Sequence, residues 1–259
     1  MKYWVIAIIW LISFVAEAND FRIVTVNEAP ANYINGQGKI DGYVTDVVQA
    51  LQQIIGDETV IEVMPEARAL YTAKAQNNVL LYSFSKTDQR NKNYHFIQKV
   101  LSKPWFIFTH RDSNLRIGSL EALHQLESIG VVIGDIRAIW LEQQGFQNLQ
   151  YSVTHEQNLK MLQAGRVSAI ASEQLAVSIV AMDLGFEPDE FSSQYQFEQS
   201  DVYIMMSQAC DDILVAQWRD AAKQLVESGE LLQIALQWQY RIQHQYGLYV
   251  DLIDDILHF

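Results

Sequence analysis

The sequence predicts an α/β protein built from two lobes. Short apolar, β-rich runs alternate with amphipathic helical stretches from residue 22 almost to the end, which is typical of largely parallel sheets covered by helices. The alternation forms two blocks, and an aromatic segment over residues 104–110 separates them. The 259 residues exceed the common domain size of about 100–150, so one large domain or two lobes are expected.

The first residues have the order of a secretory signal peptide. Lys2 supplies a positive charge, residues 4–15 form a short apolar core, and Ala16-Glu17-Ala18 matches an A-x-A cleavage site. The apolar core is shorter than the roughly 20 residues that span a bilayer, which disfavours a membrane anchor. We therefore expect a signal peptide over residues 1–18, a mature chain that begins at Asn19, and export to the periplasm.

Composition and missing motifs disfavour several classes of function. A net charge of -13 argues against binding to nucleic acid or to anionic lipid. The lone cysteine, Cys210, allows no intramolecular disulfide and is expected to be buried. The six histidines lack metal-ligand spacing, and the phosphate-loop, G-x-S-x-G and zinc signatures do not occur. We expect a soluble monomer without metal or cofactor.

The first block predicts three strands and two helices around a tight turn at residues 35–38. Apolar residues recur on one face of residues 44–55, and Gly56 is placed to end that helix. The run over residues 78–84 is largely apolar, which favours a strand buried on both faces. The other expected elements are strands over 22–26 and 59–63 and a helix over 66–76.

The second block repeats the alternation. Thr154 and Gln157 form a capping box, which predicts a helix that runs to Ala164. Strands are expected over 129–133, 149–153 and 167–171, near residue 195 and over 202–206. Helices are expected over 120–127, 136–144 and 173–184, followed by long helices between residues 211 and 240.

Two crossings between lobes follow from this order, one at residues 104–110 and one at 196–201. The second crossing lets the last helices return to the first lobe, so we expect a separate sheet in each lobe. The predicted organisation is residues 19–107 plus 200–240 in lobe 1, residues 108–199 in lobe 2, and a C-terminal extension over 241–259. The extension is too apolar for a free end and is expected to pack on a lobe or a partner.

Four motifs in the first lobe occur in a recognisable order. Residues 28–33 and 38–43 resemble E-x-P-P-x-x-Y and G-K-x-x-G-[FY], residues 65–69 resemble P-W-x-R-A, and residues 78–90 resemble N-x-x-x-[FY]-S-x-x-R-T-x-x-R. Together they make the chain similar to the family 3 extracellular solute-binding proteins, the amino-acid type of ABC-transporter binding protein. The resemblance covers residues 21–238 and implies a periplasmic-binding-protein-like fold, whose two α/β lobes close by hinge motion on a ligand.

Three residues depart from the family pattern. Glu66 stands where one branch has a cleft tryptophan, Ala31 replaces the second proline, and Ser168 replaces an aspartate. The ligand therefore cannot be copied from the family.

The resemblance and the strand ends together give candidate ligand-binding residues in lobe 1. Arg90 stands where the family has the arginine that grips a ligand carboxylate, a task that suits its planar fork. Arg68 is a second candidate, and Ser83 and Ser85 lie at the carboxyl end of a buried strand, where α/β sheets usually bind ligands. The alternatives are surface arginines and strand-end hydroxyls.

Further candidates are acidic, aromatic or placed in lobe 2. Glu28 and Glu66 are expected to put two carboxylates in the cleft, which suits an amine or guanidinium ligand, although most glutamates are simply exposed. Tyr33 is a candidate aromatic wall, with core packing as the alternative. The remaining candidates follow strands of lobe 2, where capping of a helix is the alternative: Asp135, Arg137 and Glu173.

These residues predict reversible capture of a small polar ligand, an amino acid or a related metabolite, without catalysis. The resemblance implies an ABC permease as partner. Two alternatives stay open: a signalling protein whose closed form is read by a membrane sensor, and a dehydratase-like enzyme on the same fold, which needs a buried acid such as Glu173.

Overall fold

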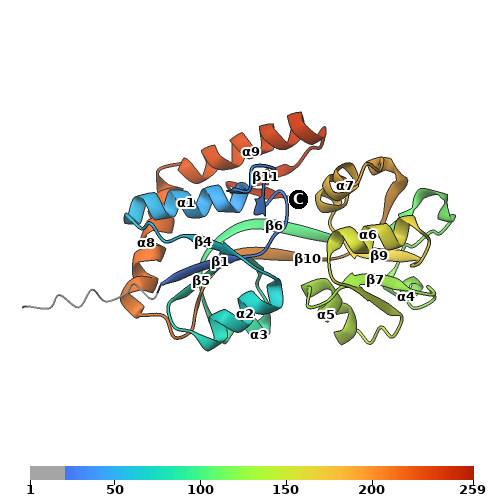
Figure 1. The fold of residues 1–259 in the computed structure, drawn as a ribbon, viewed down its shortest axis with the longest axis horizontal. Helices are drawn as coiled ribbons and strands as arrows, with labels where there is room; N and C mark the ends of the chain where they lie inside the picture. Colours follow the sequence, from blue (N-terminus) through green and yellow to red (C-terminus); the bar gives the residue numbers. More distant parts are fainter. Residues whose placement is uncertain (1–20) are drawn as a thin grey trace, which may run out of the picture.

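Two lobes lie side by side in the computed structural model, which describes residues 21–259 (Figure 1). The expected signal peptide and the expected start at Asn19 lie outside these residues. Two 17-residue strands, β6 (Tyr94–His110) and β10 (Phe191–Ser207), run through both lobes and connect them.

Lobe 1 is a sheet with helices on both faces. Strands β4, β1 and β5 of this sheet are parallel. The side chains of β5 point to both faces of the sheet: Leu80 and Tyr82 pack toward α1, α8 and α9, whereas Leu81 and Phe84 pack toward α2. A hairpin, β2 with β3, forms around the turn expected at residues 35–38. The bounds are β1 (Arg22–Thr25), β2 (Tyr33–Ile34), β3 (Ile40–Asp41), α1 (Tyr43–Ile55), β4 (Ile61–Val63), α2 (Glu66–Ala75), β5 (Val79–Ser85), α3 (Asp88–Asn91), α8 (Asp212–Glu227) and α9 (Glu230–Tyr246).

Lobe 2 has its own parallel strands and its own cores. Strand β9 pairs with β6 on one side and with β7 on the other, and α5, α6 and α7 cover the faces. The bounds are α4 (Leu120–Leu123), β7 (Ile129–Val132), α5 (Ile136–Gln143), β8 (Leu149–Ser152), α6 (His155–Gln163), β9 (Ala169–Ser172) and α7 (Gln174–Asp183), with 3-10 turns at Arg111–Ser113 and Pro188–Glu190. Within residues 21–259 no helix is long and apolar enough to cross a membrane.

The separate sheets expected for the two lobes are in fact joined. The strand order is β4-β1-β5-β10-β6-β9-β7-β8, and β6 and β10 are antiparallel partners from Tyr94 and Ser207 to His110 and Phe191. The two short strands expected near residue 195 and over 202–206 are therefore one strand, and the crossing over 104–110 is only the second half of β6. Hydrogen bonding between the crossings keeps both extended, so no turn separates the lobes.

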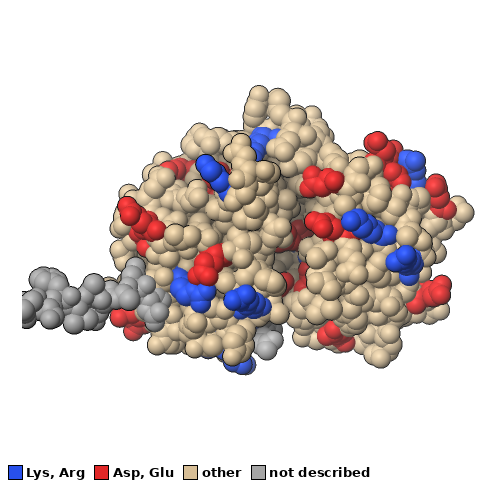
Figure 2. Space-filling view, in the orientation of Figure 1, with Lys and Arg blue, Asp and Glu red and all other residues tan. Residues whose placement is uncertain are grey.

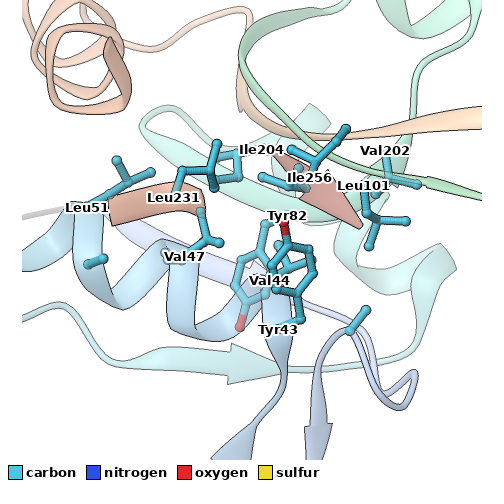
Figure 3. Close-up of a cluster of buried hydrophobic side chains, with 14 of the residues drawn as sticks. Tyr43, Val44, Val47, Leu51, Tyr82, Leu101, Val202, Ile204, Leu231 and Ile256 are labelled. Carbon is cyan, nitrogen blue, oxygen red and sulfur yellow. The ribbon is translucent and has the colours of Figure 1, made fainter. Parts of the chain in front are cut away.

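The helix expected over residues 44–55 is confirmed, with its apolar face in the core. Val44, Val47 and Leu51 of α1 are fully buried beneath the terminal helices and the strands (Figure 3). Gly56 ends the helix in the left-handed conformation, with φ of 76°, and its N–H donates to the carbonyl of Gln52. The helix expected over 120–127, in contrast, ends at Leu123.

The C-terminal extension packs on lobe 1, as expected. Residues of β11 (Asp251–Ile253) and β12 (Ile256–His258) form a hairpin, and β12 adds to β6 in parallel, with Leu257 opposite Leu101. Ile256, Leu257 and Phe259 are buried in the cluster that includes α1 (Figure 3). Two residues of α7 in lobe 2, Leu175 and Ile179, belong to the same cluster, so lobe 2 also contacts this core.

Leu257→Ala is expected to lower the free energy of unfolding by about 2–5 kcal/mol, because it leaves a cavity at a fully buried site. Ile253 lies in the same hairpin but is about half exposed, so Ile253→Ala is the matched control and should cost much less. Urea denaturation of both variants measures the difference. Equal losses would mean that the hairpin is not anchored through its buried face.

Candidate functional site

A cavity of about 1150 Å3 lies between the lobes. Ser85 and Arg90 of lobe 1 line it on one side, Ile136 and Trp140 of α5 line it on the other, and Trp105 of β6 contributes from the crossing. Figure 2 shows the surface hollowed between the two halves of the molecule, with acidic atoms in the hollow. The volume slightly exceeds the roughly 300–1,000 Å3 of common small-molecule pockets.

Arg90 is held in the cavity wall by neighbours from its own lobe. The hydroxyl of Thr87 accepts from the Arg90 backbone N–H at 3.2 Å and begins α3. The Arg90 Nη1 donates to the Ser85 carbonyl at 2.9 Å, and Nη2 donates to Glu66 Oε1 at 3.0 Å. The guanidinium also lies 5.4 Å from the Phe84 ring centroid. The predicted carboxylate-binding arginine therefore already has a carboxylate partner.

Glu66 is the first residue of α2 and contacts Arg90, which lines the cavity. Its side chain is 28 % exposed, whereas that of Arg90 is 9 % exposed. Burial and the negative charge of Asp135 raise the pKa of Glu66 to about 7, against the opposing effect of Arg90. Asp135 belongs to lobe 2, so a charge of one lobe acts on the protonation of an acid of the other.

The two predicted serines differ in their hydrogen bonding. Ser85 shares a 3.0 Å hydrogen bond with the hydroxyl of Ser200 in β10. Ser83 adopts a φ of 70°, lies where β5 shifts register against β10, and is buried. Its Oγ has no hydrogen-bond partner among the described residues, and Ser83 does not line the cavity.

Five charged side chains, which we call the interlobe cluster, lie where the lobes meet, beside the residues that line the cavity and not among them; four are buried and Glu28 is 15 % exposed. Lys103 of β6 places its Nζ 2.8 Å from Glu28 Oε2 and 3.4 Å from Glu173 Oε2. Arg137 of α5 bonds Asp135 Oδ2 at 2.5 Å, bonds Glu173 through Nη1, and lies 3.8 Å from Glu28 Oε1. Glu28 belongs to lobe 1, and the other acids and the arginine belong to lobe 2. The cluster therefore connects the lobes directly.

The charges of the cluster act on each other's protonation. Burial opposes ionisation of all three carboxyl groups, but Lys103 and Arg137 hold the pKa of Glu28 low, and Arg137 holds that of Asp135 low. For Glu173 burial dominates and raises the pKa. The carboxylates of Glu173 and Glu28 outweigh the burial of Lys103 and raise its pKa, so the ammonium stays charged.

Two predicted site residues, Tyr33 and Arg68, do not line the cavity, and Asp135 has the capping role that was its alternative. Tyr33 accepts a 3.0 Å hydrogen bond from Arg241, which also pairs with Asp41 within lobe 1. Arg68 is exposed on α2. At the start of α5, the Arg137 N–H donates to Asp135 Oδ1 at 2.8 Å, which confirms Asp135 as the helix cap.

Sequence reasoning missed Lys103 and His155. His155 opens α6, and its Nε2 lies 3.6 Å from Asp135 Oδ2; burial and Arg137 lower its pKa. A signal existed for Lys103, because it is a single charge within the otherwise apolar or small residues of 100–108 and buried charges need partners. Its two partners, Glu28 and Glu173, were both candidates but were not connected to Lys103 from the sequence.

Lys103→Met is expected to lower the free energy of unfolding by about 3–5 kcal/mol, because it leaves two buried carboxyl groups without their shared cation. Lys99 lies on the same strand, and its pair with Asp201 is 31 % and 41 % exposed. Lys99→Met is therefore the control and should cost less than about 1 kcal/mol. Urea denaturation compares them, and similar small losses would contradict a structural role for the cluster.

Comparison with known proteins gives a family match and a fold match. The model of the bacterial extracellular solute-binding proteins, family 3, matches residues 21–241. No curated protein sequence matches the chain significantly. Among solved structures, a histidine kinase sensor domain with similarity to periplasmic binding proteins aligns with a TM-score of 0.76 and 17 % identity, over 84 % of this chain and 95 % of that one.

Two amino-acid binding proteins are similar to nearly the same extent. A mutant of ArgBP from T. maritima has a TM-score of 0.72 and 15 % identity, over 88 % of this chain and 96 % of its own. The arginine-, lysine-, histidine-binding protein ArtJ from Geobacillus stearothermophilus has a TM-score of 0.71 and 16 % identity, over 86 % and 98 %. At these identities the similarity establishes the two-lobed fold with its cleft.

Proposed function

Because the chain belongs to the bacterial extracellular solute-binding proteins of family 3, we propose that it captures a small polar ligand between its lobes and releases it unchanged. The observation that carries this proposal is the cavity that both lobes line, with Arg90 in its wall. A ligand in this place contacts both lobes at once, so binding stabilises the closed arrangement over an open one.

Arg90 provides the anchor for a carboxylate. Its guanidinium is buried, so it needs an anionic partner, and in the free protein that partner is Glu66. Glu66 is more exposed and its pKa lies near neutrality, so it yields its place without leaving an uncompensated charge. A ligand carboxylate replaces it on Arg90, and the hydroxyls of Ser83 and Ser85 lie on the strand that leads to this position.

The contacts of Glu173 favour binding over catalysis. A dehydratase-like reaction needs an acid that reaches the substrate, whereas Glu173 is 4 % exposed and bonded to both Lys103 and Arg137. A proton donor held by two cations in this way is poorly placed to exchange protons with a ligand.

The ligand-bound form is proposed to deliver its ligand to an ABC permease in the periplasm, in line with the expected export signal. ArtJ and the substrate-binding protein of an amino acid ABC transporter share the fold. The similarity to a histidine kinase sensor domain supports the second candidate, a sensor that reads the closed form. Deleting the gene separates them: a transporter component loses ligand uptake, and a sensor component loses the transcriptional response with uptake intact.

Thermal-shift screening of the mature protein against amino acids, organic acids, polyamines and dipeptides is expected to reveal a stabilising ligand. Calorimetric titration with that ligand should then show that Arg90→Ala weakens binding by about 2–5 kcal/mol, because a buried ligand charge loses its partner. Arg90→Lys should restore little, since an ammonium cannot form two parallel hydrogen bonds.

The control for this experiment is Arg116→Ala, because Arg116 is exposed in lobe 2 away from the cavity lining. It should bind like the wild type. If Arg90→Ala is folded and binds equally well, the arginine is not part of the site.

Binding of a carboxylate is also expected to weaken as the pH rises above about 7. When the ligand takes Arg90, Glu66 loses its cation and faces Asp135, Glu28 and the ligand, so its pKa rises above the value of about 7 in the free protein. Binding then takes up a proton, and affinity falls by up to about tenfold per pH unit between the two pKa values, with a plateau below about 7. Calorimetric titrations at pH values from 6 to 9 measure this change, and the affinity is expected to fall by on the order of one decade over that range.

Glu66→Gln is the matched variant for the pH series, because a glutamine cannot ionise and has nearly the same shape. Its affinity should be independent of pH over this window and at least equal to that of the wild type. A pH dependence that persists in Glu66→Gln would assign the proton to another group, such as His155.

A further inference from the structure

The carboxylates of the interlobe cluster are already paired with internal cations. Glu28 has Lys103 and Arg137 as neighbours, and Glu173 has the same two. Asp135 accepts from the Arg137 backbone N–H and from its Nε and Nη2, and His155 lies beside it. Each acidic group of the interlobe cluster is therefore occupied. Of the acids that line the cavity itself, Asp201 pairs with Lys99 at 2.7 Å, and Glu198 accepts a hydrogen bond from the Gln199 backbone N–H.

Displacing the internal cations is unfavourable, because Lys103 and Arg137 have side chains that are 5 % and 4 % exposed. A ligand ammonium that took Glu173 would leave a buried cation without a partner. It would also lie next to that cation, and like charges repel strongly where water is excluded. The cluster therefore favours ligands that bring no positive charge of their own.

The Arg90–Glu66 pair behaves differently, since one partner is exchangeable. Glu66 is the more exposed of the two, and burial together with Asp135 favours its protonated form. When it leaves Arg90 it takes up a proton, so it offers no negative charge to a ligand ammonium. One carboxylate replaces another, and the charge of the cleft is preserved.

The rest of the cavity wall is largely apolar on the side of lobe 2. Trp105, Trp140, Ile136 and Ile139 line it, and the rings of Trp105 and Trp140 both pack against Phe197, with centroids 5.9 and 5.3 Å from it. These side chains offer contact area to an apolar or aromatic body rather than hydrogen bonds.

From these contacts we infer that the ligand is a carboxylic acid with an apolar body and no ammonium group, bound through Arg90 and excluded from the interlobe cluster by Lys103 and Arg137. The inference rests on the proposed function and narrows it. It separates this chain from ArgBP and ArtJ, whose names refer to arginine or to basic amino acids, although the fold is shared. It also replaces the amine or guanidinium ligand that Glu28 and Glu66 suggest in the sequence.

The test uses compounds that differ only in the α-amino group: 3-phenylpropanoate against phenylalanine, indole-3-propanoate against tryptophan, and 4-methylpentanoate against leucine. The third member of the first set is 2-phenylethylamine, which has the ammonium without the carboxylate. Calorimetric titration of the full mature chain at pH 7 is expected to show each bound acid at least about tenfold tighter than its amino acid, with no binding of the amine.

The outcomes separate this inference from the proposed function. Amino acids that bind as tightly as their acids, or more tightly, overturn the inference and leave the binding function standing. If only amine-bearing compounds of the wider screen stabilise the protein, the inference is likewise overturned and the binding function stands. If no compound of the matched pairs and no compound of the wider screen binds, both the inference and the proposed function are overturned.

Lys103→Met tests the source of the selectivity. Removing this ammonium leaves Glu28 and Glu173 with Arg137 but without Lys103, so both can accept a further cation, and the variant should lose at least about tenfold of the preference for acid over amino acid. Lys99→Met is the control on the same strand and should keep the wild-type preference. If Lys103→Met folds and keeps the full preference, Lys103 does not set the specificity. If the variant does not fold, the titrations of the wild-type protein with the matched acids and amino acids test the inference.

Discussion

A buried ammonium on a strand that belongs to both lobes constrains the arrangement of the whole molecule. Lys103 lies at the crossing, where it is shielded from water and therefore needs carboxylate partners. One partner, Glu28, follows the first strand of lobe 1, and the other, Glu173, precedes α7 of lobe 2. Both lobes must be positioned so that these groups reach the same nitrogen.

Arg137 adds a second connection of the same kind from α5. The paired strands β6 and β10 limit how far the lobes can separate, and the cluster fixes how they face each other. Opening the cleft breaks the Glu28 to Arg137 contact and at least one contact of Lys103, each in a place where the charges are poorly hydrated. The closed arrangement is thus favoured by internal ion pairs, whereas the adjacent cavity holds the groups that remain available to a ligand.

The sequence predicted those parts of the fold that depend on local patterns. Helix α1 could be predicted because its apolar period, its length and Gly56 agree. The continuity of β10 could not, because residues 192–201 are mostly polar and are kept extended by pairing with β6, a partner about 90 residues away. The candidates Glu28, Asp135, Arg137 and Glu173 come together in space, but the pairing of Glu28 and Glu173 with Lys103 depends on the orientation of two lobes, which no local pattern encodes.

One departure from the family pattern connects the cluster, the arginine and the ligand. An aromatic residue at position 66 would cover a ligand but give Arg90 no counter-ion, so a buried arginine would stay uncompensated when the cleft is empty. Glu66 supplies that counter-ion from the same lobe. Because its pKa is near 7, it can take up a proton and leave Arg90 at little cost in free energy. The same substitution adds a negative charge opposite Asp135 and Glu28, which the internal cations of the cluster offset. An acidic residue at position 66 and buried cations at positions 103 and 137 are therefore parts of one solution to charge balance, in which a carboxylate enters by exchange and the acids of the cluster already have internal cations.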